Sequence, residues 1–187
     1  MNFFRTREEM IRSFAYAMDG KAVGVEVGTQ AGNFAKFMLN QEIQKLHLVD
    51  AWMPLGGNYA ADPANATAEI HALNESHVRQ RFEACQERIT IHKGLSQDIA
   101  RNFNEVVDFI YLDAAHDYDS VLMDLFAWCK WVKPSGTIMG HDFTCTPAAR
   151  KMGFGVVEAV RDFTAMTPWK LIAITSEEWP SFALKIK

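Results

Sequence analysis

Short apolar segments alternate with segments of helical periodicity along the chain of 187 residues. Five segments are predicted as strands, and they cover residues 22–27, 45–49, 88–92, 106–112 and 137–140. The first is a short apolar run with one glycine and one acid. The segment 106–112 is nearly all apolar, as expected for a central parallel strand covered on both faces. This alternation predicts a parallel α/β sheet whose right-handed crossovers place helices on both of its faces.

Two of the predicted helices have clear start signals. Thr6 and Glu9 form a capping-box pattern that opens a helix ending near residues 19–20. Ser96 can cap a short helix after the third strand. A polar helix is expected over residues 66–85, and its inward positions are Ile70, Val78 and Phe82.

The strongest helical periodicity begins at Tyr118, where apolar residues recur at every third or fourth position. These residues are Tyr118, Val121, Leu122, Leu125, Cys129 and Val132. The sequence Lys-Pro-Ser-Gly of residues 133–136 is expected to end this helix. Further helices are predicted over 33–39 and 156–166, and two closing strands over 169–173 and 182–186.

Composition excludes several classes of protein. The chain is 49% hydrophobic and 22% charged, which is typical of one globular domain and predicts a single domain over residues 1–187. It contains no apolar run of about 18 residues and no secretory leader pattern, so we expect no membrane partner. A net charge of −4 without a basic stripe argues against nucleic acid. Three cysteines without a CxxC pair favour a cytoplasmic location and argue against a zinc site.

Residues 51–65 form an unusual interruption in the pattern. Pro54, Gly56, Gly57, Asn58 and Pro63 predict a loop by their turn chemistry. Its length of about 15 residues is uncommon inside a compact domain, and such long loops are often functional.

Polar residues follow each of the five predicted strands. In a parallel sheet, ligands bind beyond the carboxyl ends of the strands. The residues expected at this edge are Gly28 to Gly32, Asp50, Gly94 to Ser96, Asp113 to His116, and His141 with Asp142. The sequence therefore predicts a ligand site at this edge of the sheet.

The first of these turns restricts the ligand class. Gly28 and Gly32 allow a tight turn and a close backbone approach, although glycines also mark ordinary strand-to-helix turns. Asp50 lies at the distance along the chain at which an acid meets ribose hydroxyls in nucleotide folds, but such a residue can equally cap a helix. The pattern is not GxGxxG, which counts against a dinucleotide and leaves a nucleoside without phosphates as a candidate.

Several motifs resemble those of class I S-adenosylmethionine-dependent methyltransferases. They are EVGTQAG at 26–32, VDAW at 49–52, the segment 107–121 containing LDAAHDYDSV, KPSG at 133–136, GHDF at 140–143 and GFGV at 153–156. The resemblance covers nearly the whole chain, and its later motifs are similar to a branch that includes sugar and small-molecule O-methyltransferases. It implies a Rossmann-like, doubly wound, mostly parallel sheet of seven strands with an antiparallel last strand.

This resemblance also implies a set of cofactor-binding residues. They are Glu26, Gly28, Thr29, Gly32, Asp50, Ala51, Trp52, Ser96, Gln97 and Asp113. Glu26 and the glycines would line the methionine portion, Asp50 would bind the ribose, and Trp52 would pack near the adenine. Residues 52–65 would lie over the cofactor site.

The same resemblance implies the catalytic groups. His116 would be the general base for a hydroxyl acceptor, with Asp113 beside it. Asp113, His141 and Asp142 would form a metal site for Mg²⁺, although His141 is a softer ligand than magnesium prefers. Each has a plainer interpretation: His116 starts the following helix, His141 is a structural hydrogen-bonding group, and Asp142 is a turn residue.

The leading hypothesis is thus a methyltransferase acting on a small-molecule acceptor, with a homodimer as a further expectation. Two alternatives remain open. A nicotinamide-dependent oxidoreductase would use a similar sheet, but this sequence lacks the GxGxxG motif that such an enzyme uses to bind its dinucleotide. A non-catalytic nucleoside-binding protein would keep the pocket without the reaction.

Overall fold

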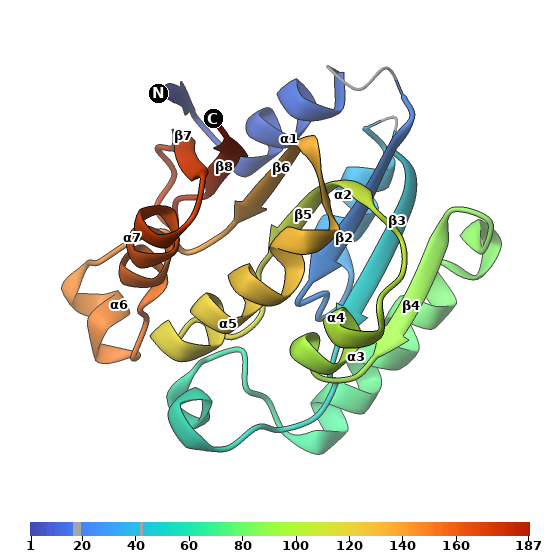
Figure 1. The fold of residues 1–187 in the computed structure, drawn as a ribbon. Helices are drawn as coiled ribbons and strands as arrows, with labels where there is room; N and C mark the ends of the chain where they lie inside the picture. The colour runs from blue at the N-terminus through green and yellow to red at the C-terminus, as the bar shows by residue number, and fades with distance from the viewer. Residues whose placement is uncertain (17–19, 42) are drawn as a thin grey trace.

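The computed structural model describes residues 1–16, 20–41 and 43–187. Its strands are β1 (Asn2–Phe4), β2 (Ala22–Val27), β3 (Ile43–Asp50), β4 (Ile89–Lys93), β5 (Val107–Leu112), β6 (Val132–Gly140), β7 (Trp169–Thr175) and β8 (Phe182–Ile186). In the described chain they form one sheet in the order β1-β7-β8-β6-β5-β2-β3-β4 (Figure 1). All neighbouring pairs are parallel except those of β8, which is antiparallel to β6 and β7.

Helices pack on both faces of this sheet. They are α1 (Arg7–Tyr16), α2 (Asn33–Leu39), α3 (Ala68–Arg81), α4 (Ser96–Asn102), α5 (Tyr118–Trp128), α6 (Pro147–Lys151) and α7 (Val156–Met166), with single 3₁₀ turns at Gly57–Ala61, Glu83–Cys85 and Cys129–Trp131. One buried cluster joins α1, α2 and α3 to the sheet through residues such as Met10, Met38 and Val78. A second cluster joins α5 and α7 to the other face through Leu125 and Phe163.

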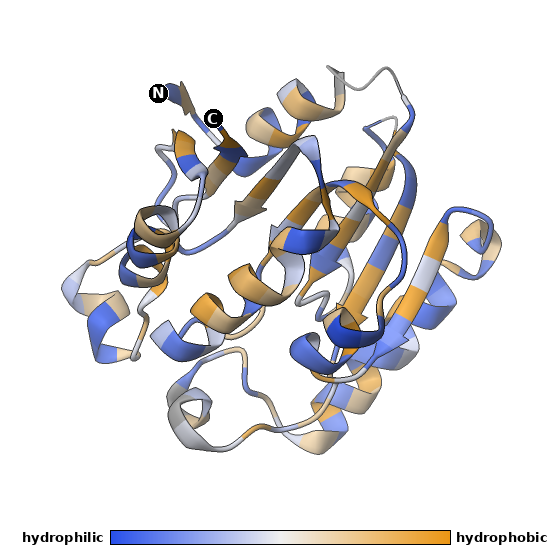
Figure 2. Ribbon diagram, viewed as in Figure 1, coloured by the Kyte–Doolittle hydropathy of each residue, from blue (hydrophilic) through white to orange (hydrophobic). Residues whose placement is uncertain are grey.

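The two clusters leave the central strands covered on both sides. Figure 2 shows hydrophobic residues running along these strands between the helices. The predicted α/β class with helices on both faces is therefore confirmed, and β2, α2 and α7 have the predicted bounds. No helix within the described ranges is long and apolar enough to cross a bilayer.

The sheet contains one strand more than the seven predicted. Residues Asn2 to Phe4 pair in parallel with residues Ala173 to Thr175 of β7. Three residues are too few to show a strand period, so only the partner strand defines β1 as a strand.

Three local predictions were wrong. Ile70 is 48% exposed on α3, whereas Val78 and Phe82 are buried as expected. Ser96 is the first residue of α4 and does not cap it, because its Oγ accepts a hydrogen bond from Trp128 Nε1 at 2.8 Å. Residues 133–136 lie within β6, since the helix before them already ends at Trp128.

The first helix begins as the capping pattern predicts. Thr6 Oγ1 accepts a hydrogen bond from the Glu9 backbone N–H at 3.3 Å. The Glu9 carboxylate returns to the backbone N–H of Arg5 at 2.8 Å, one residue earlier than a standard capping box. The predicted end of this helix near residues 19–20 falls partly on 17–19, which lie outside the described residues.

Buried His47 and half-buried His92 pair across the edge between β3 and β4. His47 Nδ1 lies 2.9 Å from His92 Nε2, and His47 Nε2 lies 3.1 Å from the Glu105 carboxylate. The edge of the His47 ring packs against Phe103. Burial, helped by the charge of Lys45, lowers the pKa of His47 from 6.5 to about 4.

This depressed pKa predicts a loss of stability in acid. Because the pKa of His47 is lower in the folded than in the unfolded chain, its contribution is present above about pH 6.5 and is lost as the pH falls toward 4. Between pH 7 and 4.5 we expect the free energy of unfolding of the wild type to fall by about 2 kcal/mol more than that of His47→Gln. Urea unfolding at several pH values measures this, with His77→Gln on the exposed face of α3 as the control. If the free energy of unfolding changed with pH in the same way in the wild type and in His47→Gln, the prediction would be contradicted.

Candidate active site

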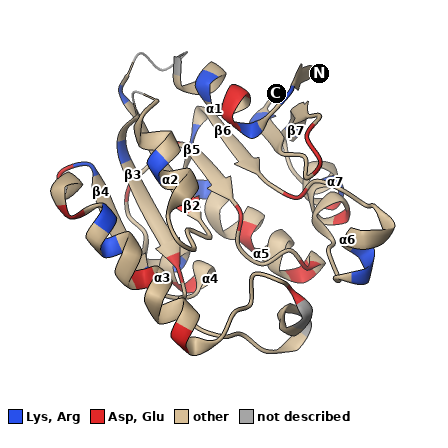
Figure 3. Cartoon of the chain, turned by 180° about the vertical axis from the view of Figure 1, so that it is seen from behind, with Lys and Arg blue, Asp and Glu red and all other residues tan. Residues whose placement is uncertain are grey.

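A cavity of about 300 Å³ opens at the carboxyl ends of β2, β3, β4 and β5. The turns after these four strands form its floor, and α1 and the loop after β3 contribute its walls. Figure 3 shows acidic residues at this end of the sheet, whereas Lys and Arg are spread over several helices. The main lining residues are Arg7, Glu26, Gly28, Thr29, Gln30, Asp50, Ala51, Tyr59, His71, Ser96, Gln97, Asp113, His116 and Asp124.

The turns after β2 and β5 meet at Gly28. Its backbone has φ of 93°, and an added Cβ would lie 2.0 Å from the carbonyl oxygen of Asp113. Hydrogen bonds from Gly28 N to Val49 O and from Asp113 N to Val27 O, at 2.8 and 2.7 Å, hold the turns in this position. The glycine is thus required by the approach of another backbone, and the same packing brings Asp113 to the cavity.

Asp50 organises the neighbouring turn from the end of β3. Its Oδ2 accepts from the Gln30 backbone N–H and its Oδ1 from the Trp52 backbone N–H, both at 2.7 Å. Each carboxylate oxygen has a second lone pair and can accept another donor. Asp50 and Ala51 line the cavity, as predicted from the sequence.

Two predicted cofactor contacts lie elsewhere. Trp52 is 4% exposed in the core, and its Nε1 donates to the Gln30 carbonyl at 2.8 Å. Gly32 faces α3, where an added Cβ would lie 3.1 Å from Val78 and from Phe82. Neither residue is part of the described cavity wall. Both support the turns that form this wall.

Glu26 presents an unsatisfied acceptor at the cavity. Its side chain is buried, and Oε2 has no hydrogen-bond partner among the described residues. Burial, together with the charges of Asp113 and Asp50, raises the pKa of Glu26 well above its usual range. The Thr29 hydroxyl is likewise buried without a partner. Unpaired buried polar atoms cost stability, so this end of the cavity is suited to a cationic or hydrogen-bonding ligand.

His116 is surrounded by three carboxylates. Its Nδ1 lies 2.6 Å from Asp62 Oδ2, which comes from the loop after β3. Its Nε2 lies 3.0 Å from Asp142 Oδ2 and 3.7 Å from Asp113 Oδ1. Neither contact has the geometry of a hydrogen bond, so Nε2 is buried without a hydrogen-bond partner among the described residues. Burial alone would lower the pKa of His116, but the three carboxylates outweigh it and raise the pKa well above the usual value. The three carboxylates therefore favour the protonated form of the ring.

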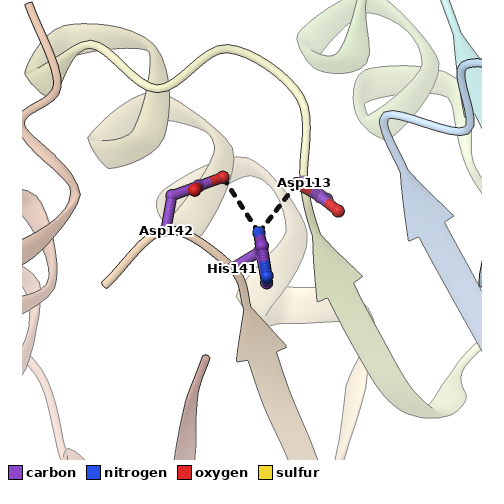
Figure 4. A group of neighbouring side chains, drawn as sticks. All are labelled: Asp113, His141 and Asp142. Carbon is purple, nitrogen blue, oxygen red and sulfur yellow. Dashed lines mark hydrogen bonds and ion pairs between the residues drawn. The ribbon is translucent and has the colours of Figure 1, made fainter. Parts of the chain in front are cut away.

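The predicted metal ligands do come together. Asp113, His141 and Asp142 can each present one ligand atom within 4.8 Å of the others (Figure 4). However, His141 Nδ1 lies 3.0 Å from Asp142 Oδ2, and Arg7 Nη1 donates to Asp113 Oδ2 at 3.3 Å. His116 and His141 hold the pKa of Asp142 well below its usual range against the effect of burial. Magnesium prefers oxygen ligands in octahedral geometry, so this imidazole-containing and already neutralised group fits it poorly.

The opposite end of the cavity lies at the turn after β4. Gln97 Nε2 donates to Asp124 Oδ1 at 2.7 Å, and Ser96 lines the cavity beside it. Asp124 projects from α5 and is buried, which raises its pKa from 3.8 to about 7. Burial therefore favours the neutral acid form of Asp124.

Sequence reasoning missed five residues at the site. Arg7, Tyr59, His71 and Asp124 line the cavity, and Asp62 contacts His116. All five lie on segments other than the strand-end turns on which the search concentrated, namely α1, α3, α5 and the loop after β3. Only the loop offered a signal, because its length already indicated a function.

The comparisons with known proteins agree with this geometry. A family model described as a methyltransferase domain matches residues 25–143. A methyltransferase from Streptococcus mutans in complex with S-adenosylhomocysteine (SAH) has a TM-score of 0.68 at 10% identity, covering 98% of this chain and 99% of that one. The N-methyltransferase NodS from Bradyrhizobium japonicum has a TM-score of 0.67 at 12% identity, with 96% and 94% covered.

A third structure, the tRNA methyltransferase TrmK from B. subtilis, has a TM-score of 0.57 at 12% identity, covering 95% of this chain and 65% of that one. No curated protein matches the sequence significantly. At such low identities the solved structures establish the fold alone.

A sheet in which antiparallel β8 lies between β6 and β7, with its cavity at the parallel strand ends, is the fold of class I S-adenosylmethionine-dependent methyltransferases. The chain belongs to the methyltransferase-domain family that matches residues 25–143, and it is an S-adenosylmethionine-dependent enzyme of that class. This favours the leading sequence hypothesis over the oxidoreductase and the non-catalytic binding protein.

Proposed function

We propose that this enzyme methylates a hydroxyl oxygen of a sugar or another small molecule. The observation that carries the proposal is the pairing of His116 with Asp62, 2.6 Å apart and next to Asp113 at the cavity wall. A hydroxyl must lose its proton during methyl transfer, and a histidine oriented by a carboxylate is a common means of accepting it.

The cavity residues fit the cofactor in the order of the strands. Since β5, β2, β3 and β4 are neighbours, Asp113, Gly28, Asp50 and Ser96 follow one another along the sheet edge. Glu26 would accept the α-ammonium, Asp50 the ribose hydroxyls, and Ser96 with Gln97 would contact the adenine. When bound, S-adenosylmethionine supplies an electrophilic methyl group on a sulfonium, open to in-line attack by the acceptor oxygen.

His116 would take the acceptor proton at Nε2. The Asp62 carboxylate would accept a hydrogen bond from Nδ1–H of the neutral ring. The lone pair would then lie on Nε2, which is 3.0 Å from Asp142 Oδ2 and 3.7 Å from Asp113 Oδ1. Because the three carboxylates raise the pKa of His116, the neutral ring becomes more abundant as the pH rises. Asp113 would orient the acceptor hydroxyl. Magnesium has no part in this step, because the donor set suits it poorly.

The loop of residues 52–65 is proposed to cover the bound cofactor and acceptor. Asp62 ties this loop to His116, and Leu55 and Asn65 close its base through two hydrogen bonds of 2.8 and 2.9 Å. A cavity of about 300 Å³ suits a small molecule better than a polynucleotide. The fold itself does not decide the acceptor, as its occurrence in a tRNA methyltransferase shows.

Transfer of a labelled methyl group tests the acceptor class. The enzyme is incubated with methyl-labelled S-adenosylmethionine and, in separate reactions, with a filtrate of cellular small molecules and with total RNA. We expect the label in O-methyl products of the filtrate. Label in RNA, or only in N-methyl products, would contradict the proposal.

Removing the Asp50 carboxylate is expected to weaken cofactor binding. Asp50→Ala should reduce the binding free energy of SAH by about 1 to 3 kcal/mol, because a charge-assisted hydrogen-bond pair to the ribose is lost. Titration calorimetry measures the affinity for SAH, and Asp119→Ala, at an exposed position, is the control. Unchanged affinity in Asp50→Ala would place the ribose elsewhere, and absence of SAH binding by the wild type would overturn the proposed function.

A further inference from the structure

Arg7 stands out among the residues that line the cavity. It is the first residue of α1, and no other Lys or Arg is found in the described part of the cavity wall. Its guanidinium lies 4.3 Å above the ring of Phe34 and donates from Nη1 to Asp113 Oδ2 at 3.3 Å. A cation is thus held at the end of the cavity that contains Glu26 and Asp113.

The position of Arg7 is fixed from several sides. Its backbone N–H donates to Glu177 Oε1 at 2.8 Å, which ties the start of α1 to the loop between β7 and β8. Thr6 caps the same turn. Phe34 supports the flat face of the guanidinium, so its N–H edge is the part left for polar partners. Such anchoring reduces the entropy lost when a ligand binds.

The guanidinium retains donors for a ligand. It has five N–H groups, of which Nη1 donates to Asp113 and Nε approaches Glu8 at 3.6 Å. The Tyr111 hydroxyl is a further polar neighbour that, against the effect of burial, raises the pKa of Arg7. These contacts do not use all five donors. Glu26, at the same end, has the opposite deficit, since its Oε2 is buried without a donor. A cationic donor and an unpaired carboxylate at one end of a cavity complement an amino acid zwitterion.

We propose that Arg7 binds the α-carboxylate of the cofactor's methionine portion while Glu26 accepts its α-ammonium. The inference rests on the proposed cofactor site and adds to it a residue outside the strand-end turns. Arg7 would donate to the carboxylate through the N–H groups that Asp113 leaves free. The bond to Asp113 would also connect cofactor binding to the residue beside the acceptor.

Two ligands separate the carboxylate contact from all others. SAH carries both the ammonium and the carboxylate, and 5′-(3-aminopropylthio)-5′-deoxyadenosine lacks only the carboxylate. Both have a neutral sulfur, so changes in the charge of Asp113 affect them alike. We expect the wild type to bind SAH at least tenfold more tightly than the decarboxylated ligand, and Arg7→Met to reduce this preference to less than threefold.

The ratio is measured by calorimetry within each variant, so a partial loss of folded protein does not alter it. Arg12→Met, at an exposed residue of the same helix, is the matched control and should keep the wild-type preference. Glu26→Gln should weaken both ligands to a similar extent, because both carry the ammonium. A preference retained in Arg7→Met, or absent in the wild type, would overturn the inference and leave the cofactor site intact. If the wild type bound neither ligand, the proposed function would be overturned as well.

Discussion

Replacing Gly28 with alanine is expected to lower the free energy of unfolding by about 3 to 5 kcal/mol and to abolish SAH binding. The backbone at Gly28 has φ of 93°, which strains any residue with a Cβ, and the added Cβ would lie 2.0 Å from Asp113 O and 2.3 Å from Asp113 C. Both of these atoms belong to the backbone, so no side-chain rotation relieves the clash. The turns after β2 and β5 must separate, which also displaces Asp113.

Gly153→Ala isolates the contribution of strain alone. Gly153 has φ of 81°, but an added Cβ would meet nothing within 4 Å. We expect this variant to lose only about 1 kcal/mol. Urea unfolding followed by circular dichroism measures both. Similar losses in the two variants would show that the close approach of Asp113 is not what requires glycine at position 28.

Removing the imidazole of His116 is expected to reduce turnover about 10²- to 10⁴-fold while SAH affinity stays within about threefold. The reason is that the ring would move the acceptor proton without contributing to the cofactor subsites. The rate of labelled methyl transfer measures turnover, and His77→Ala at an exposed histidine is the control. Equal losses of turnover and SAH affinity would instead make His116 a structural residue.

The pH dependence of turnover tests the same role independently. With a pKa of His116 raised by its carboxylates, the rate should increase with pH from neutrality until the ring is mostly neutral. Asp62→Asn removes one of the three carboxylates and should shift this profile to lower pH, together with a reduced maximum because Nδ1 is no longer oriented. A profile that does not move would show that Asp62 has no influence on the ionisation that limits turnover.

Much of the fold could be predicted because each central strand carries its own signal. Residues 22–27 and 107–112 are covered on both faces, so they appear as apolar runs interrupted only by one acid each, Glu26 and Asp108. β1 and Ile70 show where this reasoning fails. β1 exists only through its pairing with β7, and the outward position of Ile70 depends on how α3 lies against the sheet.

The site, like the fold, was predicted where local sequence signals sufficed and missed where tertiary packing decides. The sequence placed Glu26, Asp50, Asp113 and His116 at one edge because parallel strands present their carboxyl ends together, and the structure brings all four to one cavity. It could not separate residues that face the cavity from those that support it. Trp52 and Gly32 therefore appeared to be ligand contacts, although they pack against the core and against α3.

Sequence periodicity and turn chemistry determined the succession along the chain of every strand after β1 and of the helices between them except α6, the position of the polar turns and the α/β class of the fold. Only the tertiary structure decided that Arg7 enters the cavity, that Asp62 reaches His116, and that three carboxylates surround one imidazole. The physical reason is that periodicity is a local property of the backbone, whereas a charge environment depends on segments 54 and 106 residues apart in the chain.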